Sequence, residues 1–217
     1  MNDNRPIVGI TMGDPVGIGP ELICLALNHP EVYDVARPLV IGDAQILETA
    51  KLITRSPSLI ATVNSPGAAS YKPGCIDVLN SSKIDPTTLV WGQPTKNTGK
   101  AMEHYIITAI DMALNDEIAA IVTCPINKTA LKLAESKFHG HTELLADRTG
   151  TKEYAMMMAG DRLRVVLVTI HISLKQVPES LTIENIMSTI ETTDYSLKER
   201  FGIESPKIAV AGLNPHA

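Results

Sequence analysis

The chain has 217 residues, of which 44% are hydrophobic and 20% charged, a balance that is typical of a globular protein and excludes a disordered one. A formal net charge of -5, without any long basic run, argues against a nucleic-acid partner. No apolar stretch reaches a membrane span of roughly eighteen residues, no secretion signal opens the chain, and three scattered cysteines favour reduced thiols, so we expect a cytoplasmic protein.

Short β-branched segments alternate with longer amphipathic segments along the chain. In the first half we expect a helix that opens at Pro20 and ends before Pro30, helices at 44–53 and 95–115, and strands at 6–12, 37–42, 58–64, 75–80 and 118–124. In the second half we expect helical segments around 141–149, a helix at 182–200, and strands at 154–159, 163–170 and 207–212. The alternation predicts an α/β protein with a largely parallel sheet.

Domain organisation is not marked by composition. We assign residues 1–129 to a first α/β domain and residues 130–217 to the start of a second, truncated α/β domain.

Polar residues follow directly after four of the predicted apolar strands. In open α/β sheets, ligands bind outside the carboxyl ends of the strands, on loops that a rigid scaffold holds. We therefore expect one rim to carry Asp14, Asn127, Lys128, His171, Asn214 and His216.

The loop GDPVGIGPE, residues 13–21, contains three glycines before Pro20. Glycines allow a close approach of the backbone to a ligand, and the start of the following helix favours an anion. The alternative interpretation, to which we give equal weight, is that the loop is a strained turn that needs a residue with positive φ. Its spacing matches neither the Rossmann fingerprint nor a P-loop.

The remaining polar residues each carry a functional and a structural interpretation. In HGHTE, the structural interpretation is that Thr142 is a helix N-cap with Glu143 in the first turn. The functional interpretation is that His141 and Thr142 bind an anionic or hydroxylated substrate. Lys128 is a phosphate ligand, a proton carrier or a surface residue at a helix entry. His171 and His216 meet at one metal ion or are ordinary polar histidines, and a catalytic zinc site uses three protein ligands.

Five motifs occur in order: GDPVGIGPE, TCPINK, GHTE, an apolar strand ending in His171, and AGLNPHA. Together they resemble the 4-hydroxythreonine-4-phosphate dehydrogenase family of vitamin B6 biosynthesis and its paralogues. The resemblance implies a two-domain α/β/α fold similar to isocitrate and isopropylmalate dehydrogenases, and a homodimer with the active site at its interface. It also implies NAD as cofactor and a divalent metal cation (Zn, Mg, Mn or Co) bound by three histidines.

Carried over by residue, the resemblance gives His171 and His216 as metal ligands and His141 and Thr142 as substrate-binding residues. The third metal histidine of the family lies in a later motif, and the sequence stops inside an NPHAGEG-type motif, so we expect a partial chain.

The implied reaction oxidises the C3 hydroxyl of a phosphorylated four-carbon acid and then decarboxylates it to a three-carbon ketone phosphate. The TMGDP loop favours D-threonate or D-erythronate 4-phosphate as substrate, with 4-hydroxythreonine 4-phosphate as the alternative. A phosphate acyltransferase and a non-catalytic phosphate-binding domain are the alternatives from other classes.

Overall fold

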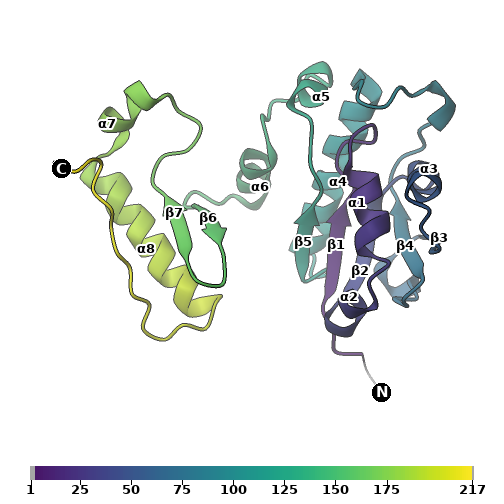
Figure 1. The fold of residues 1–217 in the computed structure, drawn as a ribbon, viewed down its shortest axis with the longest axis horizontal. Helices are drawn as coiled ribbons and strands as arrows, with labels where there is room; N and C mark the ends of the chain where they lie inside the picture. Colours follow the sequence, from purple (N-terminus) through teal and green to yellow (C-terminus); the bar gives the residue numbers. More distant parts are fainter. Residues whose placement is uncertain (1–2, 217) are drawn as a thin grey trace. The chain divides into compact units, whose positions relative to one another are not determined.

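The computed structural model describes residues 3–216, and a five-stranded parallel sheet forms its larger part (Figure 1). The strand order is β3-β4-β2-β1-β5, and every neighbouring pair is parallel. The strands are β1 (Ile7–Thr11), β2 (Arg37–Gly42), β3 (Leu59–Val63), β4 (Cys75–Asn80) and β5 (Ala120–Thr123). The predicted α/β class with a largely parallel sheet is confirmed.

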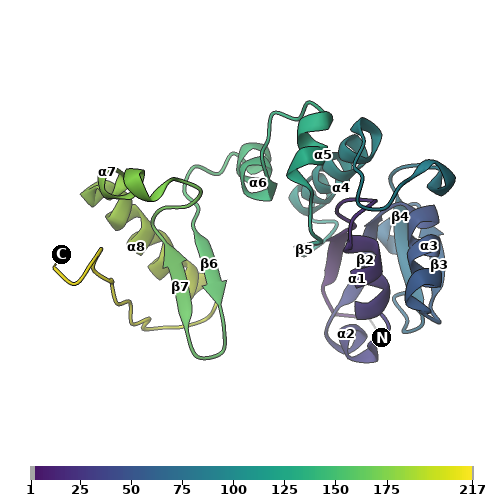
Figure 2. The same ribbon diagram turned by 45° about the horizontal axis from the view of Figure 1, so that its top comes forward.

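Helices cover both faces of this sheet. On one face, α1 (Gly19–Ala26) and α3 (Ala44–Thr54) pack together, and the short α2 (Pro30–Val35) leads into β2. The chain crosses the sheet in one direction from β1 to β3 and in the opposite direction from β3 to β5, so a right-handed connection places α4 (Lys96–Leu114) on the other face. Accordingly, α4 contacts β1, β2 and β5 (Figure 2).

The core is centred on β2, because this strand has a neighbour on each side and a helix layer on each face. Leu39, Val40 and Ile41 are fully buried. The strand β5 is also apolar, but it lies at the edge of the sheet and Val122 is 51% exposed. A continuous apolar run therefore does not distinguish a central strand from an edge strand here.

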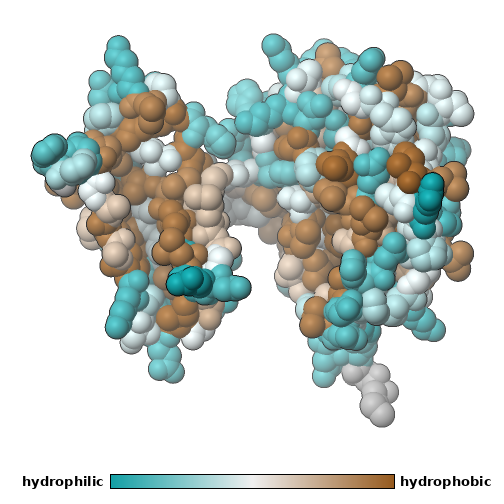
Figure 3. All heavy atoms as spheres, viewed as in Figure 1, coloured by the Kyte–Doolittle hydropathy of each residue, from teal (hydrophilic) through white to brown (hydrophobic). Residues whose placement is uncertain are grey.

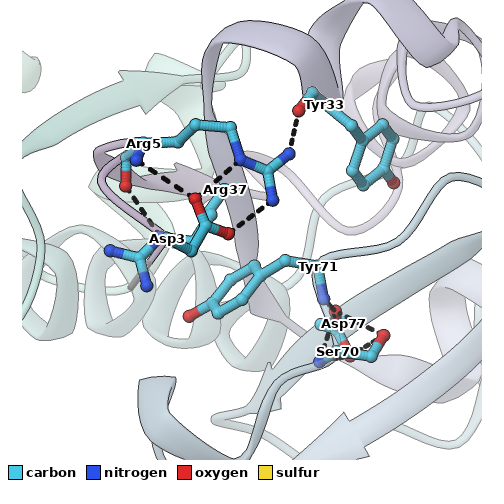
Figure 4. Close-up of polar contacts among 7 residues, drawn as sticks. All are labelled: Asp3, Arg5, Tyr33, Arg37, Ser70, Tyr71 and Asp77. Carbon is cyan, nitrogen blue, oxygen red and sulfur yellow. Dashed lines mark hydrogen bonds and ion pairs between the residues drawn. The ribbon is translucent and has the colours of Figure 1, made fainter. Parts of the chain in front are cut away.

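Polar contacts fasten the amino ends of the strands (Figure 4). The Arg37 guanidinium donates from Nε to the Arg5 carbonyl at 2.7 Å and lies 5.5 Å from the centre of the Tyr71 ring. The Tyr71 amide in turn donates to the buried Asp77 carboxylate at 2.7 Å. Because these groups contact one another, they have a structural role at this end of the sheet.

Two further helices, α5 (Lys128–Leu133) and α6 (His141–Thr149), pack on α4. Residues Met1–Gly150 therefore form one compact unit, and Thr151–Ala217 form a second. The division between 129 and 130 falls inside the first unit; as a division of the family's domains it stays a prediction.

The second unit is built on an antiparallel pair, β6 (Met156–Ala159) and β7 (Arg164–Leu167). The short turns η3 (Leu174–Gln176) and α7 (Val177–Ser180) precede α8 (Ile183–Glu199), which contacts β7. The predicted helix at 182–200 is confirmed. The predicted strand at 207–212 is wrong: these residues pair with no strand within the described part of the chain, and a strand requires such a partner for its backbone groups.

Apolar surface remains open in the second unit (Figure 3). A cavity of about 630 Å³ lies between α8, β7 and residues 206–211, and Val165, Ile190, Leu197 and Val210 contribute to its lining. Among residues 3–216, no helix combines the length and the apolar character that crossing a membrane requires.

Candidate functional site

The loop after β1 packs closely against the loop after β5. Gly13 has φ +73°, and a Cβ placed there would collide with the Pro125 carbonyl oxygen. The Asp14 amide donates to that same oxygen at 3.1 Å. The positive-φ turn predicted as one alternative for this loop is confirmed at Gly13. Protein backbone occupies the space beside Gly13, so the loop does not offer the open glycine turn of a Rossmann dinucleotide site.

Asp14 is almost fully buried, with 3% of its surface exposed. Desolvation raises the pKa of its carboxyl group, while hydrogen bonds from the Val16 amide and the Asn127 side chain act in the opposite direction. The Val16 amide lies 3.1 Å from Asp14 Oδ1. The structure thus brings together two of the predicted rim residues, Asp14 and Asn127, from the carboxyl ends of adjacent strands.

Asn127 also begins helix α5. Its Oδ1 accepts hydrogen bonds from the amides of Thr129 at 2.9 Å and Ala130 at 3.3 Å. Such an N-cap satisfies backbone donors that the first helical turn leaves free. Lys128 is then the first residue of the helix and is exposed, which is the helix-entry position that the sequence suggested.

A cavity of about 600 Å³ opens beside the start of α4, between this helix and the loop after β4. Ser82, Lys83, Thr95 and Lys100 contribute to its lining. The amide of Gly92, in the same connection, donates to the Val16 carbonyl at 2.8 Å and ties this segment to the loop after β1. Sequence reasoning missed this cavity; the segment TKNTGK, with hydroxyls and lysines at a helix start, was the signal available.

His141 is the first residue of α6, and its ring is partly buried. Burial lowers the pKa of the imidazole, so the neutral form is favoured. Its Nε2 is buried and has no hydrogen-bond partner among the described residues. Thr142 was predicted as the N-cap, but Gly140 occupies that position and Thr142 lies inside the first turn. Instead, Glu143 accepts a hydrogen bond from the His139 amide at 2.8 Å.

His171 and His216 both lie in the second unit and are exposed. β7 ends at Leu167, so residues 168–170 separate the strand from His171, whose φ is +56°. Within the described residues, the segment 207–215 just before His216 forms no strand, and the His216 amide donates to Asn214 Oδ1 at 2.8 Å. The expectation that both histidines directly follow strands of the parallel sheet is wrong. We expect His141, of the first unit, to share one cleft with His171 and His216, which stays a prediction.

Imidazole nitrogens are suitable ligands for a divalent metal. However, no three His, Cys, Asp or Glu side chains within the described residues form a cluster that could hold one. The described part of the chain therefore does not assemble a three-ligand metal site.

Comparison with known proteins gives the family. Residues 34–217 match the model of the pyridoxal phosphate biosynthetic protein PdxA. The chain is 56% identical over 216 residues to a 4-hydroxythreonine-4-phosphate dehydrogenase of Desulforapulum autotrophicum and 42% identical over 217 residues to a D-threonate 4-phosphate dehydrogenase of Cupriavidus necator. These alignments cover 100% of the chain but 64% and 65% of the two relatives, so the chain spans slightly less than two thirds of their length.

A solved structure gives the same result. The crystal structure of a 4-hydroxythreonine-4-phosphate dehydrogenase from Klebsiella pneumoniae matches with a TM-score of 0.90 at 37% identity. The match covers 100% of this chain and 65% of that one. From the ordered motifs, the parallel sheet and these matches, we conclude that the chain belongs to the PdxA family.

Proposed function

We propose that the chain is part of an NAD-dependent dehydrogenase that oxidises the C3 hydroxyl of a small phosphorylated four-carbon acid and then decarboxylates the product. Membership of the PdxA family supports this, since the relatives are named as dehydrogenases of phosphorylated hydroxy acids. In such an enzyme a divalent metal, which His171 and His216 would help to hold, would supply Lewis-acid chemistry, and NAD would supply the hydride acceptor. The homodimer that the family resemblance implies is part of the proposal.

The observation that carries the proposal is the buried Nε2 of His141, which has no partner among the described residues. A buried polar atom without a partner is costly, and a hydrogen bond from a bound substrate would remove that cost. Its lowered pKa keeps the ring neutral, so one nitrogen can accept and the other donate. We therefore assign His141, with the neighbouring Thr142, to substrate binding.

The test of this assignment is the His141→Ala variant in a chain of the full length of the relatives. We expect a loss of kcat/KM with a phosphorylated substrate of about tenfold or more, since an uncompensated hydrogen bond to a charged group is worth about 1.5–3 kcal/mol. His139→Ala is the matched control, because His139 is exposed and, among the described residues, its hydrogen bond uses the backbone amide, which the substitution keeps. Equal losses in both variants would contradict the assignment.

His171 and His216 are the proposed metal ligands. Replacing either with Ala in the same full-length chain should abolish stoichiometric metal in elemental analysis. His29→Ala serves as the control, because His29 is an exposed residue beside Glu31 in the first unit. Unchanged metal content in both ligand variants would exclude the two histidines as ligands.

The choice of substrate has two candidates. The TMGDP loop favours D-threonate or D-erythronate 4-phosphate, whereas the higher identity of 56% favours 4-hydroxythreonine 4-phosphate. Comparing kcat/KM for these three phosphates and their unphosphorylated forms decides between them. Equal rates with and without the phosphate would refute the role of the phosphate in binding and orientation.

A further inference from the structure

The connection between α5 and α6, which leads directly to His141, is fastened to α4 at two points. The Ser136 hydroxyl donates to Glu103 Oε1, on α4, at 2.6 Å. One residue earlier, Glu135 forms an ion pair with Lys96, also on α4, at 2.8 Å. The two contacts differ in their surroundings, since Glu103 and Ser136 are partly buried, whereas the side chains of Lys96 and Glu135 are exposed.

The Ser136 hydroxyl organises the turn that follows it. Its hydrogen goes to Glu103, and its oxygen accepts a hydrogen bond from the Phe138 amide at 3.1 Å. The Ser136 amide donates to the Leu131 carbonyl at 3.0 Å, which joins the turn to the last part of α5. Because Glu103 fixes the direction of the hydroxyl, it also fixes the acceptor that the Phe138 amide meets.

The rest of the connection is fixed by packing and by one more hydrogen bond. The Phe138 side chain packs against a buried cluster that α4 and α6 share. This cluster consists of Ile106, Ile110 and Leu144. The His139 amide then donates to Glu143 in the first turn of α6 at 2.8 Å. The backbone that precedes His141 is therefore tied to both helices.

His141 depends on this support, because its own ring gains little where it lies. The buried Nε2 has no hydrogen-bond partner among the described residues. A polar atom in that position would be more favourable in contact with water, so the surrounding structure must keep the ring in place until a ligand supplies a hydrogen bond.

We propose that Glu103 is a positioning residue for His141 and acts through Ser136. The proposal rests on the proposed function, in which His141 binds the substrate. The contribution of Glu103 is the orientation of the imidazole, so its loss should weaken substrate binding and leave the chemical step largely intact. The expected result is a raised KM with little change in kcat.

The kinetic test uses a chain of the full length of the relatives. Glu103→Ala and Ser136→Ala should each raise KM about tenfold, the effect of about 1.4 kcal/mol, because a hydrogen bond to a charged group is lost. Glu103→Gln should keep most of the affinity, since its amide oxygen still accepts from Ser136. Lys96→Gln is the matched control, because it breaks the exposed contact between the same two segments. Equal increases of KM in Glu103→Ala and Lys96→Gln, or in Glu103→Ala and Glu103→Gln, would overturn the proposal.

A double-mutant cycle separates positioning from general stability. If Glu103 acts through His141, removing it from a His141→Ala chain should change KM by less than about twofold, because the group that it positions is already absent. A further tenfold increase in the double variant would show independent effects and would overturn the positioning role.

An NMR titration of the His141 ring in the present chain tests the proposal without turnover. Burial lowers the pKa of this imidazole, and a ring that is released to solvent should return toward about 6.5. Ser136→Ala and Glu103→Ala should therefore raise its pKa, while Lys96→Gln and Glu103→Gln leave it unchanged. Loss of the Glu103 charge alone would lower this pKa, so the direction of the change identifies its cause.

The titration also distinguishes failure of this proposal from failure of the proposed function. If the full-length chain oxidises none of the phosphates while the pKa of His141 rises in both Ala variants, the proposed function fails and the positioning of His141 remains. If the pKa is unchanged in both Ala variants, the positioning role is refuted, whatever the enzyme does. Ser136→Ala removes only a hydroxyl from a connecting segment, so it decides the question even if Glu103→Ala does not fold.

Discussion

Replacing Gly13 with Ala should destabilise the first unit strongly, for two separable reasons. A residue with a side chain at φ +73° is strained by about 1–2 kcal/mol relative to glycine. The new methyl group would also collide with the Pro125 carbonyl oxygen and lies 3.1 Å from the carbonyl carbon of Cys124. Relieving this collision separates the two loops and breaks the bond from the Asp14 amide, at a further cost of about 1–2 kcal/mol. The expected total is about 3 kcal/mol.

Gly74→Ala provides the control for the backbone strain. Gly74 has φ +81°, and a Cβ there meets nothing within 4 Å, so its cost should stay near about 1–2 kcal/mol. The free energy of unfolding is obtained from urea titrations followed by fluorescence of Trp91, the only tryptophan, which lies in the first unit. Equal destabilisation by Gly13→Ala and Gly74→Ala would refute the argument from the collision.

Three further predictions concern buried groups. Asp43→Ala should cost about 3 kcal/mol by the same assay, because the 1%-exposed carboxylate caps α3 and also accepts from Ser82 and the Ile84 amide. His141, whose pKa is lowered by burial, should make the folded state lose stability as pH falls through the unfolded value of about 6.5, and His141→Asn should reduce this slope in titrations at several pH values. Burial raises the pKa of the Cys124 thiol to about 11, so alkylation followed by mass spectrometry at pH about 8 should label it only after unfolding; labelling at equal rates in folded and urea-unfolded protein would contradict its burial.

Local sequence signals predicted most of the first unit. The strands at 37–42 and 75–80 have the observed bounds, because Pro and Gly mark their ends and apolar β-branched residues fill them. The position of a strand within the sheet was not predictable: β5 is as apolar as a central strand yet lies at the edge. The position of a strand depends on pairing between segments that are distant in sequence, and the composition of the strand does not reveal that pairing.

The second unit shows the same limit more clearly. Residues 207–212 have a strand-like sequence, but a strand exists only where a neighbour accepts its backbone hydrogen bonds, and no described segment does so. At the candidate site, the sequence predicted that Asp14 and Asn127 share an edge, since both follow parallel strands. The sequence did not predict that the Asp14 carboxyl group would be buried instead of exposed at that edge. Its burial depends on how closely the loop at Gly13 approaches Pro125.

The order of strands in the sheet also has a consequence for synthesis of the chain. β1 pairs with β2 on one side and with β5 on the other, although β5 begins only at Ala120. As the protein leaves the ribosome, β1 to β4 can pair while one edge of β1 stays bare, because its second neighbour has not yet been made. Contacts between residues so distant in sequence form late. Asp14 and Asn127 therefore meet only when the last strand of the sheet docks, and completion of the sheet and assembly of this part of the site are one event.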